Sequence, residues 1–241
     1  MEHQPFERAA IFGASGGIGR ALCQALAERG TRVWALSRSP KSERAAGIDP
    51  LPFDLGDENS ISLAAETMRA SPPQLVMVCT GALTLGDGTG PERSYRQLDG
   101  AAMAEAFRIN TIGPALIAKH MLALLPRDER SVFGALSARV GSISDNRLGG
   151  WHSYRASKAA LNMLVRNFAI ELGRTHKQAS VVALHPGTVD TGLSEPFQAN
   201  LPEGQLTSPA QAARHLLDVV DRLTPAHSGK AFDWQGEEIP S

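Results

Sequence analysis

Cysteine is scarce in this sequence. Cys23 and Cys79 are the only two cysteines among 241 residues. Two cysteines do not make a disulfide framework, and both stand in apolar stretches, so we expect buried free thiols in a reducing compartment. The seven histidines are scattered and show no Cys/His spacing of a metal site. We therefore predict no bound metal and a cytoplasmic location.

Long apolar runs and an excess of charge of one sign are also absent. No uninterrupted apolar run of this sequence approaches the roughly 18 residues of a membrane span. The first ten residues include acids and no apolar stretch, so we expect no secretory signal. The chain has 24 Lys and Arg against 25 Asp and Glu, which gives a net charge of −1. This balance argues against nucleic acid or an anionic membrane as a partner bound through overall charge.

Short apolar runs alternate with longer segments of helical periodicity along the whole chain. With 42% apolar residues, 241 residues suit a single α/β domain over residues 1–241. Short strands without polar–apolar alternation are buried on both faces, which predicts a doubly wound parallel sheet with helices on both faces. Strands are expected at 9–12, 33–36, 51–54, 75–79, 132–137, 180–184 and 230–234. Helices are expected at 17–29, 60–68, 100–125 with an interruption near 110–114, 154–172 and 209–223.

The first expected strand runs into a glycine-rich turn. The turn reads Gly13-Ala14-Ser15-Gly16-Gly17-Ile18-Gly19 and opens a helix. Glycine lets the chain reverse tightly and lets the backbone approach a pyrophosphate at the helix N-terminus. A plain glycine turn is the alternative. The strand before it and the helix after it favour the nucleotide site of a Rossmann fold.

The end of the second expected strand indicates which dinucleotide binds. An acidic residue there would hold a ribose 2′-hydroxyl, but Ser37 and Arg38 stand in its place. Both can donate hydrogen bonds to a 2′-phosphate, and Lys41 and Arg44 add positive charge nearby. We therefore predict NADP(H) rather than NAD(H) as the cofactor. An ordinary surface arginine after a strand is the alternative interpretation of Arg38.

Tyr154 and Lys158 form a candidate acid–base pair. They are four positions apart at the start of the long expected helix, so they share a face. A tyrosine with its ordinary pKa of about 10 is a poor proton donor or acceptor at neutral pH, and a nearby ammonium lowers that pKa by stabilising the phenolate. Such a pair is common on solvated helix faces. Its place after the nucleotide-binding half and after a strand that ends at Ser137 favours catalysis.

These motifs together resemble the short-chain dehydrogenase/reductase family over essentially the whole chain. The resemblance is carried by Gly13, Gly17, Gly19, Asp54, Leu55, Thr80, Gly81, Ala82, Asn110, Ser137, Tyr154, Lys158, Pro186, Gly187, Val189 and Thr191. The stretches 141–151 and 154–162 further resemble a subgroup of sniffer-type carbonyl reductases and C-factor-like bacterial proteins.

The resemblance implies a single NAD(P)-binding Rossmann domain that reduces an aldehyde or ketone. Tyr154 would donate the proton to the carbonyl oxygen, and Lys158 would lower its pKa and hold the nicotinamide ribose. Ser137 would hydrogen-bond the substrate oxygen. Asn110 would help to position Lys158 through water. The expected cofactor-binding residues are Gly13, Ser15, Gly17, Ile18, Gly19, Ser37, Arg38, Asp54, Leu55, Thr80, Gly81, Ala82, Asn110, Tyr154, Lys158, Pro186, Gly187, Val189 and Thr191.

The chain departs from the family pattern at two strand ends. The usual Asn-Asn-Ala-Gly is replaced by residues 79–82, which read Cys-Thr-Gly-Ala. Where the family often has two serines, this chain has Ser137 and Ala138, and the family's catalytic serine is commonly the second. We choose Ser137 as the catalytic serine and keep Ser142 and Ser144 as alternatives.

Three further expectations concern the surroundings of the site. The long helix is apolar on more than one side, which predicts a homodimer or homotetramer; coverage by neighbouring helices alone is the alternative. Loops 84–94, 142–151 and 193–206 are expected to wall the substrate pocket. Trp151 either caps the long helix or forms part of that wall. The alternative function is a C-factor-like signalling or sensor protein that holds the dinucleotide with little turnover.

Overall fold

The computed structural model describes residues 6–40, 45–200 and 206–241. Lys41 and Arg44, and part of the third expected loop, lie outside the described residues. One eight-stranded sheet runs through the described part of the chain in the order β10-β9-β6-β5-β4-β1-β2-β3. Its strands are β1 Arg8–Phe12, β2 Arg32–Ser37, β3 Ile48–Pro52, β4 Leu75–Val78, β5 Ser131–Leu136, β6 Ala179–His185, β9 Ala231–Asp233 and β10 Glu238–Ile239.

The pairing of these strands confirms the predicted α/β Rossmann fold. Every neighbouring pair is parallel except β9 with β10, which the sequence analysis did not predict. A short second sheet pairs β7 (Thr188–Val189) with β8 (Leu206–Thr207). The strand order reverses between β1 and β4, and ligands of open α/β sheets bind beside such a reversal.

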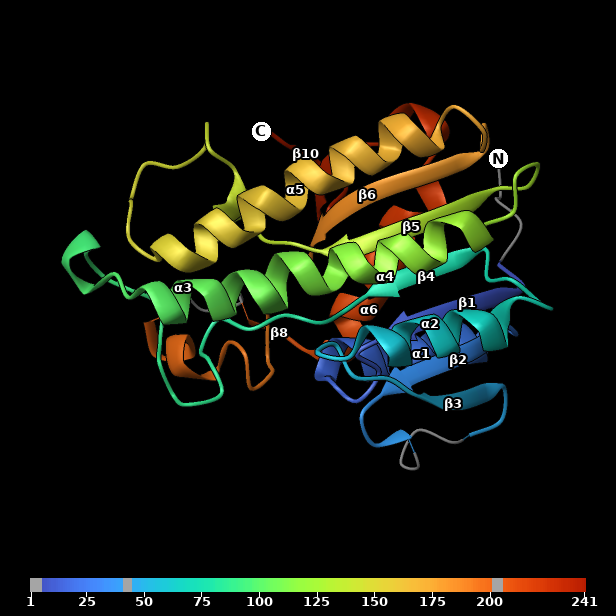
Figure 1. Cartoon of the computed structure of the whole chain (residues 1–241), viewed down its shortest axis with the longest axis horizontal. Coiled ribbons are helices and arrows are strands. Elements are labelled where there is room, and N and C mark those ends of the chain that lie inside the picture. The colour runs from blue at the N-terminus through green and yellow to red at the C-terminus, as the bar shows by residue number, and fades with distance from the viewer. Residues whose placement is uncertain (1–5, 41–44, 201–205) are drawn as a thin grey trace.

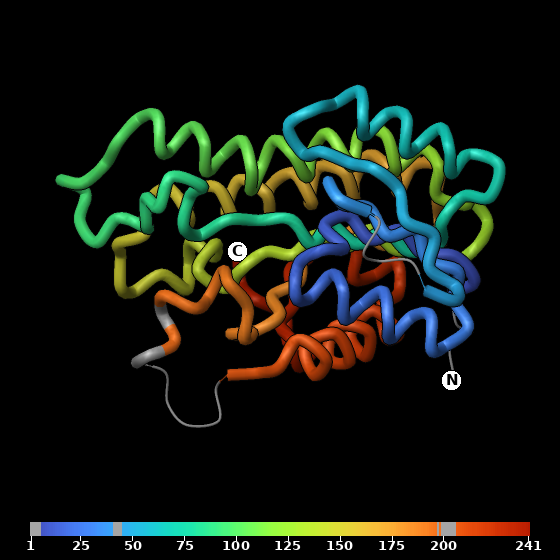
Figure 2. The backbone as a smooth tube through the Cα atoms, turned by 90° about the horizontal axis from the view of Figure 1, so that it is seen from below, coloured from blue at the N-terminus to red at the C-terminus, as the bar shows by residue number. Residues whose placement is uncertain are grey.

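Helices cover both faces of the sheet (Figures 1 and 2). α1 (Gly17–Glu28) and α6 (Pro209–Arg222) pack on one face. α2 (Glu58–Met68), α4 (Gly113–Met121) and α5 (His152–Leu172) pack on the other. Successive strand residues point to opposite faces, so each buried strand contributes to both cores.

The structure breaks the predicted helix over 100–125 at the expected place. α3 (Gly100–Phe107) is followed by a π-helical turn, Arg108–Ile112, and then by α4. Short 3₁₀ turns cover Tyr95–Gln97, Leu122–Leu124, Arg139–Gly141, Glu195–Asn200 and Pro225–His227. A π turn inserts an extra residue into the helix and recurs at functional sites.

The third strand lies earlier in the chain than predicted. The strand expected at 51–54 is displaced, because β3 covers Ile48–Pro52 and overlaps it at Leu51 and Pro52. Pro50 and Pro52 argue against a central strand, but β3 is the last strand of the sheet, and its neighbour among the described strands is β2. A proline is tolerated at an edge because no further strand needs its missing N–H.

Local signals placed the last helix correctly. The Ser208 hydroxyl accepts a hydrogen bond from the Gln211 N–H and caps α6 as its sequence predicts.

Within the described ranges, no helix is long and apolar enough to cross a membrane.

Candidate active site

The glycine turn lies at the carboxyl edge of the sheet, between β1 and α1. The N–H groups of Gly13 and Ala14 both donate to the Leu36 carbonyl, at 2.9 and 3.0 Å, which ties the turn to the end of β2. Gly13 has a φ of +87°, which favours glycine. A Cβ on Gly19 would lie only 2.2 Å from the Gly13 carbonyl oxygen. The close packing of α1 on the turn therefore requires glycine at this position.

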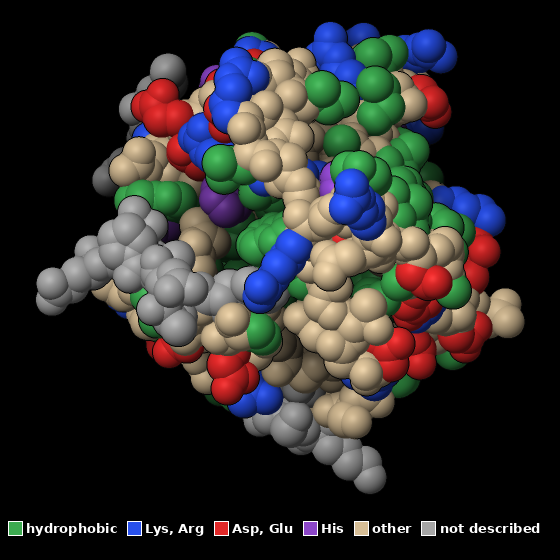
Figure 3. Space-filling view, turned by 90° about the vertical axis from the view of Figure 1, so that its left-hand side faces the viewer, with side chains coloured by type: hydrophobic (Ala, Val, Ile, Leu, Met, Phe, Trp, Pro, Cys, Tyr) green, Lys and Arg blue, Asp and Glu red, His purple; other side chains and the backbone are tan. Residues whose placement is uncertain are grey.

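A cleft of about 810 Å³ opens beside this turn. Twelve of the predicted site residues line it: Gly17, Ile18, Gly19, Thr80, Gly81, Ser137, Tyr154, Lys158, Pro186, Gly187, Val189 and Thr191. Figure 3 looks onto this side of the molecule and shows a hollow with hydrophobic side chains in its floor and basic side chains at its rim. The Thr80 hydroxyl is buried without a hydrogen-bond partner among the described residues, so it is available to a ligand.

The remaining predicted residues lie outside the walls of that cleft. They are Gly13, Ser15, Ser37, Arg38, Asp54, Leu55, Ala82 and Asn110. Ser37 ends β2, and Arg38 follows it with an exposed side chain. Asp54 and Leu55 follow β3. Because the carboxyl ends of parallel strands meet at one edge of the sheet, these four residues lie at the same edge as the glycine turn.

Asn110 connects the loop after β4 to α5. Its side chain accepts from the Ala82 N–H and donates to the Ala82 carbonyl, both at 2.9 Å, and it also donates to the Ser157 hydroxyl at 3.2 Å. A Cβ on Gly81 would lie 3.3 Å from Asn110 Oδ1 and 3.4 Å from Lys158 Nζ. The π turn thus holds the 81–82 backbone against α5.

Tyr154 and Lys158 are both buried in the first turns of α5. The Lys158 ammonium donates to the Leu136 carbonyl at 2.9 Å and lies 5.8 Å from the centre of the Tyr154 ring. Burial raises the pKa of Tyr154 to about 12 and lowers the pKa of Lys158 to about 8. The expected lowering of the Tyr154 pKa is therefore not found here, because the cost of a buried phenolate dominates.

The hydroxyl of Ser137 is engaged inside the protein. It donates to the Asn162 side-chain oxygen at 2.7 Å, and both Ser137 and Ala138 line the cleft. The alternative serines are less well placed. Ser142 is buried and accepts from the Asp145 N–H, Ser144 is exposed, and neither lines a described cavity. Ser137 is thus the candidate serine that reaches the cleft.

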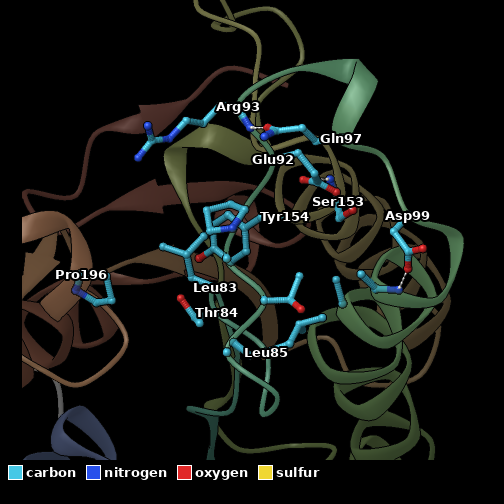
Figure 4. Close-up of a pocket in the computed structure, with 17 residues that line it drawn as sticks. Leu83, Thr84, Leu85, Glu92, Arg93, Gln97, Asp99, Ser153, Tyr154 and Pro196 are labelled. Atoms are coloured by element: carbon cyan, nitrogen blue, oxygen red, sulfur yellow. Dashed lines mark hydrogen bonds between the residues drawn. The ribbon is translucent and has the colours of Figure 1, made fainter.

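A second cavity of about 550 Å³ lies on the other side of Tyr154 (Figure 4). Its walls come from the loop over 82–93, from α3 and from the start of α5. Four residues line both this cavity and the cleft: Leu83, Arg93, Tyr154 and Pro196. The predicted wall over 84–94 is therefore present, and of the expected wall over 142–151 only Trp151 lines either cavity.

Glu92 fastens the loop of the second cavity to α5. Its carboxylate accepts the Ser153 N–H at 3.1 Å and also the Ser153 hydroxyl. Burial alone would raise the pKa of Glu92, but the hydrogen bonds from Ser153 outweigh it and hold the pKa below its ordinary value. The charged carboxylate satisfies an N–H at the start of the helix, where negative charge is favourable.

Trp151 stands at the start of α5 and also lines the cleft. It is the N-cap residue of α5 with a φ of 50°, and its N–H donates to the Glu92 carbonyl. Its indole also lines the cleft, with its ring centre 6.3 Å from that of Tyr154 in an edge-on contact. The positive φ of Gly149 and Gly150 leads the chain into this conformation.

Sequence reasoning did not single out Glu92, Arg93, Asn162 or His185. Asn162 stands four positions after Lys158, which was the available signal for a shared helix face. His185 lines the cleft, and its pKa falls to about 4 because of burial and the nearby Arg139. The described residues contain no cluster of His, Cys, Asp or Glu suited to a metal ion.

The comparison with protein families agrees with this geometry. The model of the short chain dehydrogenase family matches residues 7–202. The chain belongs to the short-chain dehydrogenase family.

The chain is similar to two particular proteins over most of their length. The chain is 36% identical over 167 residues to the C-signal of Myxococcus xanthus, covering 68% of this chain and 95% of that protein. It is 34% identical over 224 residues to 1-hydroxy-2-glutathionyl-2-methyl-3-butene dehydrogenase of Rhodococcus sp. strain AD45, covering 91% and 93%.

Solved structures share the fold. NADPH-bound carbonyl reductase from chicken fatty liver superposes with a TM-score of 0.83 at 24% identity, covering 100% of this chain and 96% of that one. The carbonyl reductase Sniffer of D. melanogaster superposes with a TM-score of 0.85 at 18% identity, covering 98% and 99%.

Proposed function

We propose that this chain is an NADP(H)-dependent oxidoreductase that reduces an aldehyde or ketone to an alcohol. The observation that carries the proposal is the place of Tyr154, which lines both the cleft beside the glycine turn and the second cavity. A phenol at that junction can protonate a carbonyl oxygen in one cavity while a dinucleotide occupies the other. The substrate is a small molecule, and we propose neither nucleic acid nor membrane as a partner.

The residues of the cleft fit a nicotinamide dinucleotide. The N-terminus of α1 opens onto the cleft and favours an anion. The buried Thr80 hydroxyl has no hydrogen-bond partner within the described ranges, and a ligand in the cleft would supply one. Arg38 at the end of β2 would hold a 2′-phosphate, which favours NADP(H). The related chicken carbonyl reductase is described as NADPH-bound. When bound, the cofactor supplies the hydride chemistry.

Tyr154 and Lys158 divide the proton chemistry between them. With a pKa of about 12 the phenol of Tyr154 is protonated at neutral pH but is a weaker acid than an ordinary tyrosine, so proton transfer from it needs a cation beside the phenolate. A Lys158 pKa of about 8 leaves its ammonium largely charged at pH 7, where it stabilises the phenolate left after proton transfer. Ser137 stands at the cleft with its hydroxyl oriented by Asn162.

The direct test is NADPH oxidation by the purified protein across a panel of aldehydes and ketones. Tyr154→Phe keeps the ring but removes the proton donor, so turnover should fall about 10²- to 10⁴-fold while NADPH still binds. Unchanged carbonyl reduction by this variant would remove Tyr154 from the mechanism.

A second candidate function is a dinucleotide-binding signalling or sensor protein. The similarity to the C-signal of Myxococcus xanthus favours it. A protein that binds NADPH and turns over no member of a broad panel would support this function over the reductase. Intact Tyr154, Lys158 and Asn110 favour the enzyme, because a sensor needs only the nucleotide site. We also propose a cytoplasmic location and a homodimer or homotetramer.

A further inference from the structure

Arg93 lies at the junction of the two cavities. It is one of the four residues that line both of them, together with Leu83, Tyr154 and Pro196. Figure 4 shows its side chain extending away from Glu92 and Gln97, above Tyr154 in this view, toward the side on which Pro196 lies. The Arg93 side chain is exposed and lines both cavities, so its guanidinium is open to a molecule bound at their junction.

The other charged groups of the two cavities are already neutralised or hydrogen-bonded. Arg139 pairs with Asp145 and Asp233, at 3.1 and 3.2 Å. The Lys158 ammonium donates to a backbone carbonyl.

The two acids of the second cavity are engaged in the same way. Glu92 accepts from Ser153, and Asp99 accepts from the Ala102 N–H at 2.8 Å and caps α3. Over the described ranges, by contrast, no carboxylate lies within ion-pairing distance of the Arg93 guanidinium.

The backbone on both sides of Arg93 is held in place. Glu92 before it is bound to Ser153 and Trp151 at the start of α5. The Arg93 N–H itself donates to the Gln97 side-chain oxygen at 2.8 Å. A cation on a fixed backbone binds an anion with less loss of conformational entropy than one on a mobile loop.

We propose that Arg93 is a specificity-determining residue that binds a carboxylate of the substrate, so that the preferred substrates are carbonyl compounds carrying an acid group. The planar guanidinium donates two parallel hydrogen bonds to a carboxylate. The apolar and small residues of the second cavity, among them Leu83, Leu85 and Ala106, receive the rest of the molecule. This proposal rests on the proposed carbonyl reduction for its substrate class.

The test compares 4-carboxybenzaldehyde with its neutral methyl ester, methyl 4-formylbenzoate. The ratio of their kcat/KM values, followed by NADPH oxidation, isolates the contribution of the carboxylate. In the unmodified protein the acid should be preferred, and Arg93→Gln should reduce the ratio by about tenfold, the effect of one hydrogen bond to a charged group. Arg93→Glu should invert the preference.

Arg96→Gln is the matched control. Arg96 is exposed three positions away, lines neither cavity, and lies 5.7 Å from the Tyr95 ring centre. Arg96→Gln removes the same charge from the same segment as Arg93→Gln. A long-range electrostatic effect would therefore change the acid-to-ester ratio in both variants. The ratio should stay unchanged in Arg96→Gln.

Binding measurements separate this proposal from the proposed function. The dissociation constants of the acid and the ester are measured by calorimetry on the protein with and without NADP⁺. Arg93-dependent preference for the acid without turnover would support the anion site, and absence of turnover across the whole aldehyde and ketone panel would then contradict the reductase. Turnover with the same acid-to-ester ratio in the unmodified protein and Arg93→Gln would overturn the anion site alone. Weaker NADPH binding in Arg93→Gln than in Arg96→Gln would overturn it too, because the arginine would then serve the cofactor. If the protein neither binds nor turns over either compound, the anion site is overturned, whereas the reductase is overturned only if the whole panel is inert.

Discussion

Lys158 is a buried lysine, and its ammonium donates a hydrogen bond to the Leu136 carbonyl. Burial of a charge without a counter-ion costs stability, which is the reason for its lowered pKa of about 8. The same burial places a cation beside the Tyr154 ring, where a phenolate would need it. Stability and chemistry therefore conflict at this residue.

The stability of the cofactor-free protein should depend on pH through Lys158. Its pKa is lower in the folded chain, so between about pH 8 and pH 10 the unfolded state binds more protons at this site. The free energy of unfolding should therefore rise with pH in this window, by at most about 1.4 kcal/mol per pH unit relative to Lys158→Met. Urea denaturation of both proteins at pH 8, 9 and 10 measures the difference. Parallel pH profiles would contradict the buried, shifted lysine.

Arg38 should set the choice of dinucleotide. It is exposed at the end of β2 beside the glycine turn, where a 2′-phosphate would gain a charge-assisted contact. We expect NADPH to bind about tenfold or more tightly than NADH, and Arg38→Asp to reverse the preference. Fluorescence titration gives both dissociation constants. Arg147→Asp, in an exposed loop that lines neither cavity, controls for the loss of positive charge. Equal affinities in the unmodified protein would refute the role of Arg38.

At the scale of elements, the site depends on how closely α1 approaches the turn before it. A Cβ on Gly19 would meet backbone atoms of Gly13 at 2.2 and 2.9 Å, and backbone cannot move aside as a flexible side chain can. The loop of the second cavity depends in the same way on Glu92, which holds it to the start of α5. Both contacts serve to position structural elements around the site.

Gly19→Ala should weaken both folding and cofactor binding. Forcing a methyl group into this contact displaces α1 and should cost about 1–3 kcal/mol of unfolding free energy, with loss of NADPH affinity. Gly100→Ala is the control, because a Cβ there meets nothing within 4 Å at the start of α3. Urea denaturation and NADPH titration report the two effects. A Gly19→Ala protein as stable as Gly100→Ala would show that α1 is not held by this contact.

At the scale of the whole molecule, α5 has one face on the sheet and another toward the outside. Leu161, Val165 and Ala169 are buried, whereas Met163 is 62% and Ile170 is 51% exposed. Met163 and Ile170 are seven positions apart and so share a helix face. An apolar face of this kind on α5 is a candidate subunit interface.

We therefore expect a homodimer or homotetramer that Met163→Glu combined with Ile170→Glu converts to monomers, because two buried carboxylates would be left unpaired in the interface. Size-exclusion chromatography with light scattering measures the mass. Leu63→Glu is the control, since Leu63 is 67% exposed on α2, away from α5. A monomeric unmodified protein would exclude the interface.

The sequence by itself determined the elements whose causes are local. The glycine turn, the Ser208 cap of α6 and the break of the helix near Asn110 follow from the conformational preferences of neighbouring residues. The parallel sheet followed from its unalternating apolar strands. Edge strands such as β3 and β10 were misplaced or missed, because short strands owe their existence to pairing partners rather than to their own residues.

Only the tertiary structure decided which side chains meet across the site. Asn110 binds a backbone 28 positions away, Ser137 binds Asn162 25 positions away, and Glu92 reaches Ser153 across 61. No periodicity encodes such distances, because folding brings these groups together through strand order and helix packing. The pKa values of Tyr154 and Lys158 belong here as well, since burial is a property of the folded chain and not of a spacing of four residues.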